Sequence, residues 1–158
     1  MGGMHFKENL VGGHACLTLS GDITEKADFA PILQSDLSPV VLDLLDIGRI
    51  NSSGVREWIA FVRRLAASGR RLVLLRCSPA IVQQANMITN FLGDAEVRST
   101  LAPYYCASCD FDHLEEIATE HQTKCPPHLE EELPCPKCGE MMEFSDLSAD
   151  YFAFLARG

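Results

Sequence analysis

The stretch from residue 40 to residue 66, VVLDLLDIGRINSSGVREWIAFVRRLA, constrains the fold most strongly. Its first eight residues form an apolar run that is β-branched at its start and short enough to be a strand covered on both faces. A turn with two serines and a glycine follows. Residues 53–68 then show the i, i+3, i+4, i+7 apolar spacing of an amphipathic helix. The sequence therefore predicts a buried strand, a tight turn and a helix.

The two serines of this turn, Ser52 and Ser53, stand where the predicted helix begins. Free backbone N–H groups and the helix dipole favour an anion at such a position. We therefore expect a switch or a docking point here. A second interpretation is that the serines only cap the helix, as serine often does. No nucleophile, histidine and acid are grouped in this half of the chain, and His5 and His14 fall in a terminal hairpin, so we do not expect an enzyme.

The other elements alternate around this unit. A Gly12-Gly13 pair favours a hairpin between the first two strands, and Ser78 with Pro79 is typical of a helix start. The alternation predicts the α/β class, with a mixed, mostly parallel sheet and packed helices. Strands are expected at residues 5–11, 14–20, 71–76 and 96–101, and helices at 24–34 and 79–92.

Three segments resemble the STAS domain of bacterial anti-sigma-factor antagonists. They are LTLSGDIT at 17–24, VVLDLLDIGRINSSGV at 40–55 and RLVLLRCSPAIVQQANMITNF at 71–91. The resemblance covers roughly the first 100 residues, so it implies a STAS-like domain at residues 1–102.

The middle segment implies a function. The family has Asp-Ser-Ser/Thr-Gly at this turn, and a partner kinase, itself an anti-sigma factor, phosphorylates the serine after the aspartate. Phosphorylation releases the partner, and a phosphatase resets the switch. Ser52 is the matching serine here, with Ser53 and Gly54 after it and Asn51 in place of the aspartate. A phosphorylation switch in signal transduction and an unphosphorylated docking surface for such a partner both stay open.

Four cysteines form the second informative pattern. Cys106 and Cys109 make one CxxC pair, and Cys135 and Cys138 make another after 25 intervening residues. A CxxC turn points two sulfurs at one ion, and Gly139 permits the tight backbone after the second pair. Two such turns predict a closed Cys₄ site for structural zinc. Residues 103–158 thus resemble a zinc ribbon.

This ligand set has competitors. Cys125 and His128 form a rival second pair, but CPKCG is the better metal-binding turn. Tyr104-Tyr105 and Phe144 around the pairs also resemble rubredoxin, which makes iron and electron transfer the alternative to zinc. The two cysteines outside the cluster and its loop, Cys16 and Cys77, are expected in the core.

Two further elements are expected in this region. Residues 112–122 favour a helix that buries Leu114 and Ile117. Residues 147–155 favour a terminal helix whose aromatic side chains either dock on the sheet or form a dimer or partner surface.

The net charge of −9 comes entirely from residues 104–158, which hold twelve acidic and three basic residues. This asymmetry suggests a domain boundary near residues 102–103, and it would repel a phosphate backbone, so no nucleic acid is expected as a partner. No apolar run reaches the roughly 18 residues of a membrane span. The first residues, MGGMHFKEN, show no signal peptide, so the expected location is cytoplasmic.

Overall fold

The computed structural model describes residues 3–119 and 129–157, which form a mixed α/β fold with two sheets. In the first sheet β1 pairs with β2 antiparallel, and each later neighbour pairs in parallel. This confirms the predicted α/β class with a mixed, mostly parallel sheet. Its strands, in spatial order, are β1 (His5–Val11), β2 (His14–Ile23), β3 (Val40–Ile50), β4 (Leu72–Leu75) and β5 (Glu96–Val97).

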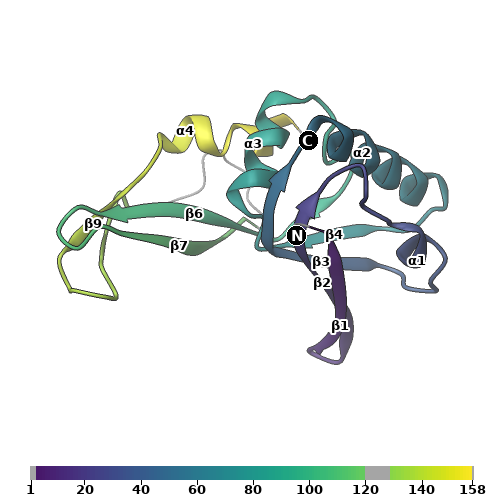
Figure 1. Ribbon diagram of the computed structural model, residues 1–158, viewed down its shortest axis with the longest axis horizontal. Helices are drawn as coiled ribbons and strands as arrows, with labels where there is room; N and C mark the ends of the chain where they lie inside the picture. The colour runs from purple at the N-terminus through teal and green to yellow at the C-terminus, as the bar shows by residue number, and fades with distance from the viewer. Residues whose placement is uncertain (1–2, 120–128, 158) are drawn as a thin grey trace.

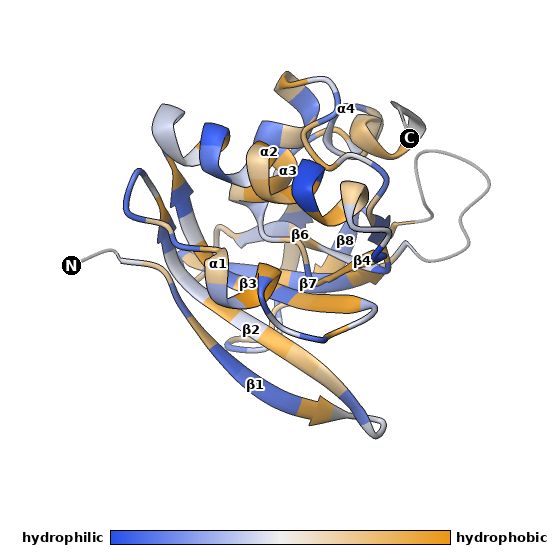
Figure 2. Cartoon of the chain, turned by 90° about the vertical axis from the view of Figure 1, so that its right-hand side faces the viewer, coloured by the Kyte–Doolittle hydropathy of each residue, from blue (hydrophilic) through white to orange (hydrophobic). Residues whose placement is uncertain are grey.

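Helices α1 (Ala30–Leu33), α2 (Ser52–Ala67) and α3 (Pro79–Met87) gather on one side of this sheet (Figures 1 and 2). Apolar side chains of β2, β3 and β4 meet the buried face of α2 there, and this contact forms the main core. Trp58 of α2 is fully buried, and its indole N–H donates to the Phe91 carbonyl at 2.9 Å. The amphipathic helix predicted from the sequence therefore supplies the centre of the core.

Asp43 of β3 is buried on the opposite side of the first sheet. The Arg76 guanidinium pairs with it, and its Nε lies 3.1 and 3.2 Å from the two carboxylate oxygens. Arg76 follows β4 in the left-handed backbone region, with φ of 47°. The other guanidinium nitrogen, Nη2, and the Leu45 N–H also donate to this carboxylate, so the cost of burying its charge is offset.

The second sheet is antiparallel and extends to one side of the first (Figure 1). β6 connects the two sheets, because the Cys77 N–H after β4 donates to the Ser99 carbonyl and the Leu101 N–H donates to the Cys77 carbonyl. β6 then continues without a break past residues 102 and 103. The strands, in spatial order, are β7 (Phe111–Ala118), β6 (Ser99–Cys106), β9 (Met141–Phe144) and β8 (Glu132–Pro134).

The tail docks on this second sheet through α4 (Ser148–Tyr151) and a 3₁₀ helix, Ala153–Arg157. The Tyr151 and Phe152 rings are buried, with their centroids 5.7 and 6.4 Å from that of Phe144. The Tyr151 hydroxyl also donates to the Leu101 carbonyl. These aromatic side chains are therefore packed within the chain, as the docking interpretation expected.

The helix predicted at residues 112–122 is wrong, because Phe111–Ala118 is strand β7. β7 pairs with β6 along its whole length. Its backbone groups therefore form hydrogen bonds with another strand and not with residues four positions away, as a helix requires. Leu114, expected in the core, is 41% exposed.

Other elements differ from the expected extent; the terminal helix expected at 147–155, for example, is α4 followed by the 3₁₀ helix. The helix expected at 24–34 shrinks to α1, where Pro31 occupies the first turn. The helix expected at 79–92 ends at Met87, because Ile88 is already extended. The strand expected at 96–101 divides into β5 and β6, which belong to different sheets. Ser78 precedes α3, but its side chain makes no capping hydrogen bond.

Candidate functional site

Asn51 links the end of β3 to the start of α2. Its backbone is extended, with φ of −92° and ψ of 178°, and its side-chain oxygen accepts the Gly54 N–H at 2.7 Å. Its own N–H donates to the Ile23 carbonyl at 3.2 Å, and its Nδ2 donates to Glu25 at 3.3 Å. Asn51 is therefore the N-cap, and the interpretation that Ser52 and Ser53 serve as the cap is wrong.

Gly54 lies where the first turn of α2 meets the end of β2. A Cβ atom added to Gly54 would stand 1.9 Å from the Ile23 carbonyl oxygen and 2.5 Å from its carbon. Both atoms are backbone, so they cannot move aside without shifting the strand. Close packing therefore requires glycine at this position, because no side chain fits between the first turn of α2 and the backbone of β2.

Ser52, the first residue of α2, is exposed, and Ser53 is half-buried. Within residues 3–119 and 129–157 the Ser52 hydroxyl makes no hydrogen bond. The first turn of α2 carries no acidic side chain. Arg49 and Arg56 are exposed on either side in sequence, and Arg56 stands four residues after Ser52, on the same side of the helix. The turn therefore combines an accessible hydroxyl with the N-terminus of a helix, whose dipole favours negative charge.

The cysteine cluster is built by two hairpins. Cys106 ends β6 and Cys109 lies in the turn before β7, while Cys135 and Cys138 lie in the turn between β8 and β9. The four sulfur atoms lie within 4.8 Å of one another, close enough to hold a metal ion. The Cys106–Cys138 and Cys109–Cys135 sulfurs are 3.5 and 3.7 Å apart. A tetrahedral ion with metal–sulfur bonds of about 2.3 Å requires sulfurs about 3.8 Å apart, so the geometry fits.

The two turns share one backbone feature. The residue after the second cysteine has positive φ in both, 55° at Asp110 and 84° at Gly139. In the second turn the Gly139 N–H donates to the Cys135 carbonyl at 2.9 Å, and the Cys135 N–H donates to the Glu140 carbonyl at 2.7 Å. The sequence indicated this backbone conformation only for Gly139, but Asp110 adopts it in the first turn. Aspartate is among the residues that tolerate positive φ.

The thiols of the cluster differ in acidity. Burial works against ionisation of Cys135, but the N–H groups of Cys138 and Lys137 outweigh it and lower the pKa of Cys135 to about 7. Burial and hydrogen bonds to the neighbouring sulfurs raise the pKa of Cys109 to about 12. Four thiolates at these distances would repel one another, and a metal cation between them would offset that repulsion.

Two further cysteines and two histidines of the described residues, singled out in the sequence, lie outside this cluster. Cys16 and Cys77 are buried, as expected, and His5 and His14 are exposed. The rival ligands Cys125 and His128 lie outside the described residues.

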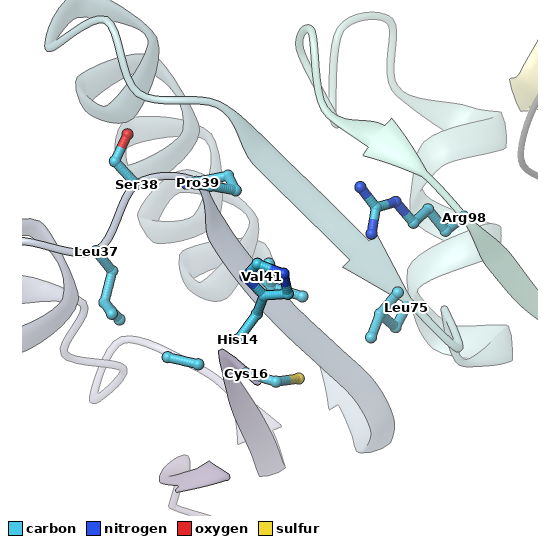
Figure 3. A pocket seen from close by; sticks show the side chains of 9 residues that line it. His14, Cys16, Leu37, Ser38, Pro39, Val41, Leu75 and Arg98 are labelled. Atoms are coloured by element: carbon cyan, nitrogen blue, oxygen red, sulfur yellow. The ribbon is translucent and has the colours of Figure 1, made fainter. Parts of the chain in front are cut away.

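A hollow of about 300 Å³ opens on the side of the first sheet that α1, α2 and α3 leave uncovered (Figure 3). Cys16, Val41 and Leu75 line it, with His14 and Arg98 at its edges. Burial, followed by the Asp43 carboxylate, raises the pKa of the Cys16 thiol, so this sulfur is a poor nucleophile at neutral pH.

No helix in the described part of the chain is long and apolar enough to cross a membrane. Comparison with models of known protein families finds no match, and comparison with curated proteins finds no significant similarity.

Proposed function

We propose that this chain is a non-enzymatic regulatory protein of the anti-sigma-factor antagonist type, with a STAS-like domain. It binds a protein partner, such as an anti-sigma factor or serine kinase, through the surface around Ser52. One observation carries the proposal: Asn51 takes the capping role, and the exposed Ser52 hydroxyl therefore has no structural task at the N-terminus of α2. A residue with no structural task at this position is available for modification or recognition.

A phosphate on Ser52 fits the local chemistry. It would carry about −1.5 to −2 charges. The helix dipole, together with Arg49 and Arg56, would stabilise that charge, whereas the Glu25 carboxylate beside Asn51 would oppose it; the first turn of α2 itself adds no acidic residue. The added charge would also change the surface that a partner meets. The site thus supports a switch in which phosphorylation alters docking without altering the fold.

The cysteine cluster is proposed to hold structural zinc in a ribbon-like module. Each of the two hairpins contributes one CxxC turn, and Cys106 and Cys135 are buried. Four thiolates fill a tetrahedral zinc and leave no open position for a substrate. Zinc bound here would join the β6–β7 hairpin to the β8–β9 hairpin, and its role would be stability.

The switch is tested with a partner kinase isolated by pull-down. Incubation with this kinase and ATP, followed by mass spectrometry, should place phosphate on Ser52. Ser52→Asp should change partner affinity, whereas Ser68→Ala, an exposed serine at the other end of α2, should not. Phosphate only at other positions would remove the switch, and unchanged binding by Ser52→Asp would remove the docking surface as well.

The alternative is a rubredoxin-like iron protein for electron transfer. Aromatic rings near the cysteines favour it: Tyr104 of β6 packs on Phe144 of β9 with centroids 5.6 Å apart. Visible absorbance and metal content of the purified protein separate the two. Coloured protein with iron supports electron transfer, and colourless protein with about one zinc per chain excludes it.

A further inference from the structure

The two faces of the second sheet differ in what covers them. Tyr104, Met142 and Phe144 point to one face and are buried, packed beneath the tail with Tyr151 and Phe152. The helices lie on that same side (Figure 1). The strand register assigns the neighbouring residues of each strand to the other face.

That other face, which we call the open face, carries a row of apolar side chains. Tyr105 of β6 pairs with Asp112 of β7 and Glu143 of β9. Leu114 lies two residues after Asp112 and Met141 two residues before Glu143, so both point the same way as Tyr105. Their exposures are 39% for Tyr105, 41% for Leu114 and 52% for Met141. They are three of the seven large apolar residues exposed in the described chain, and they share one face. This grouping distinguishes the row from scattered surface residues.

A hollow of about 350 Å³ lies beside this row. Tyr105, Met141, Glu143 and Phe144 line it, together with Ala107 and Ser145. An incoming apolar side chain could enter it and contact both Tyr105 and Met141. The open face therefore offers a depression as well as exposed apolar area.

The charged residues that the strand register assigns to the open face are acidic; Glu116 also acts on Arg76, whose guanidinium is already paired with Asp43. The register places Asp112, Glu116 and Glu143 on it, and Glu132 of β8 pairs with Glu143. Asp110 accepts a hydrogen bond from the Tyr105 hydroxyl at 2.7 Å. Lys137, the basic residue of the second CxxC turn, lies over the Phe111 ring at 5.6 Å. A second copy of this face would bring carboxylates against carboxylates, so the charges select a cationic partner.

We propose that the open face docks a cationic segment of another protein, one that carries apolar side chains between lysines or arginines. The apolar residues of that segment cover Tyr105, Leu114 and Met141, and its basic groups pair with the surrounding carboxylates. This surface lies on the second sheet and does not depend on the proposed role of Ser52.

The probe is a short synthetic peptide of alternating leucine and lysine, titrated into the zinc-loaded full chain. Amide shifts in NMR spectra should concentrate on β6, β7 and β9, and added salt should weaken binding because the charged groups are exposed. Two matched peptides, one with glutamate for lysine and one with serine for leucine, should each bind at least about tenfold more weakly.

Variants of the chain complete the test. Leu114→Ser with Met141→Ser removes the apolar row, and Glu116→Lys with Glu143→Lys reverses the charge; each pair should weaken binding about tenfold or more. The matched controls are Leu10→Ser, which changes a 75% exposed leucine on β1, and Asp94→Lys, which reverses an exposed charge outside the second sheet. Circular dichroism and zinc content identify any variant that fails to fold, and the other pair then decides.

Three results would overturn the proposal. They are the absence of binding to the wild-type chain, equal binding by the glutamate peptide, and unchanged binding by both folded variant pairs.

Discussion

The side-chain oxygen of Asn51 lies 2.7 Å from the backbone nitrogen of Gly54, and this hydrogen bond begins α2. The cap is thus supplied by the residue before the serines. Capping and recognition are divided between neighbours: Asn51 secures the helix, and Ser52 faces solvent. Substitutions at the two positions should therefore have different effects.

Replacing Asn51 by alanine should lower the free energy of unfolding by about 1 kcal/mol, because the Gly54 N–H loses its acceptor. Ser52→Ala should change it by less than about 0.5 kcal/mol, since that hydroxyl is exposed. Urea unfolding of both variants measures the difference. A loss at Ser52 equal to that at Asn51 would show that the serine is the cap.

Asn51→Asp restores the acid of the antagonist motif and tests a second feature. An aspartate keeps the acceptor for Gly54 but cannot donate to Glu25, which Asn51 does at 3.3 Å. Two carboxylates would then stand close together at the turn, and their repulsion opposes the gain from the helix dipole. We expect a variant less stable than wild type, and one that becomes more stable when Glu25 is also changed to glutamine.

Gly54→Ala should destabilise the fold by about 3 kcal/mol or more, because its Cβ would overlap the Ile23 carbonyl. Gly48→Ala is the matched control. A Cβ there comes closest to the Asp22 side chain, at 3.1 Å, which can rotate away, and the Gly21 carbonyl oxygen at 4.0 Å is at ordinary contact distance. Thermal unfolding of both variants checks the prediction. Equal melting temperatures would mean that α2 can move away from β2 at no cost.

Removing the proposed metal should destabilise the second sheet before the first. Cys138→Ser should lose the bound ion, and amide hydrogen exchange should accelerate in β8 and β9, which the metal joins to β6. Cys16→Ala should keep the full metal content, because Cys16 lies in β2, outside the cluster. Retention of one zinc per chain by Cys138→Ser would contradict the assigned ligand set.

High pH should unfold the protein partly through Tyr104. Burial, and then the carboxylates of Glu115, Glu131 and Glu130, raise the pKa of Tyr104 from 10.0 to about 12. The folded state thus disfavours its ionised form, and the associated stability is complete below about pH 10 and is lost as pH rises toward 12. Tyr104→Phe should flatten this decline. Unfolding curves across this range, with tyrosine ionisation followed by absorbance, measure it.

Local signals explain which parts of the fold were predictable. The apolar run of β3 and the helical spacing of α2 are both contained within a few turns of chain, and both elements form as expected. CxxC spacing is also a local signal, since each turn by itself brings two sulfur atoms close together. The four cysteines therefore lie together as predicted, close enough to hold a metal ion, and the binding of zinc stays a proposal.

Long-range pairing explains the main error. Leu114 and Ile117 are three residues apart, a spacing that favours a helix, and acidic residues between them hide the alternation of a strand. The Cys106–Cys109 turn sends the chain back along β6, and eight register pairs then hold β7 extended. Those pairs join residues up to 19 positions apart, from Ser99 to Ala118. A pattern within a few neighbouring residues therefore cannot predict this pairing. The capping role of Asn51 could have been predicted from the sequence, because asparagine is a favoured N-cap residue.

The continuity of β6 determines which truncated fragments of the protein can remain soluble. A fragment that ends at residue 102 would stop halfway along this strand and lose β7, which pairs with Ser99, Thr100, Leu101 and Ala102. The backbone groups of those four residues would then form a bare strand edge, which recruits other chains. Such a fragment should aggregate even with the first sheet intact, whereas one extended through β7 retains the pairing.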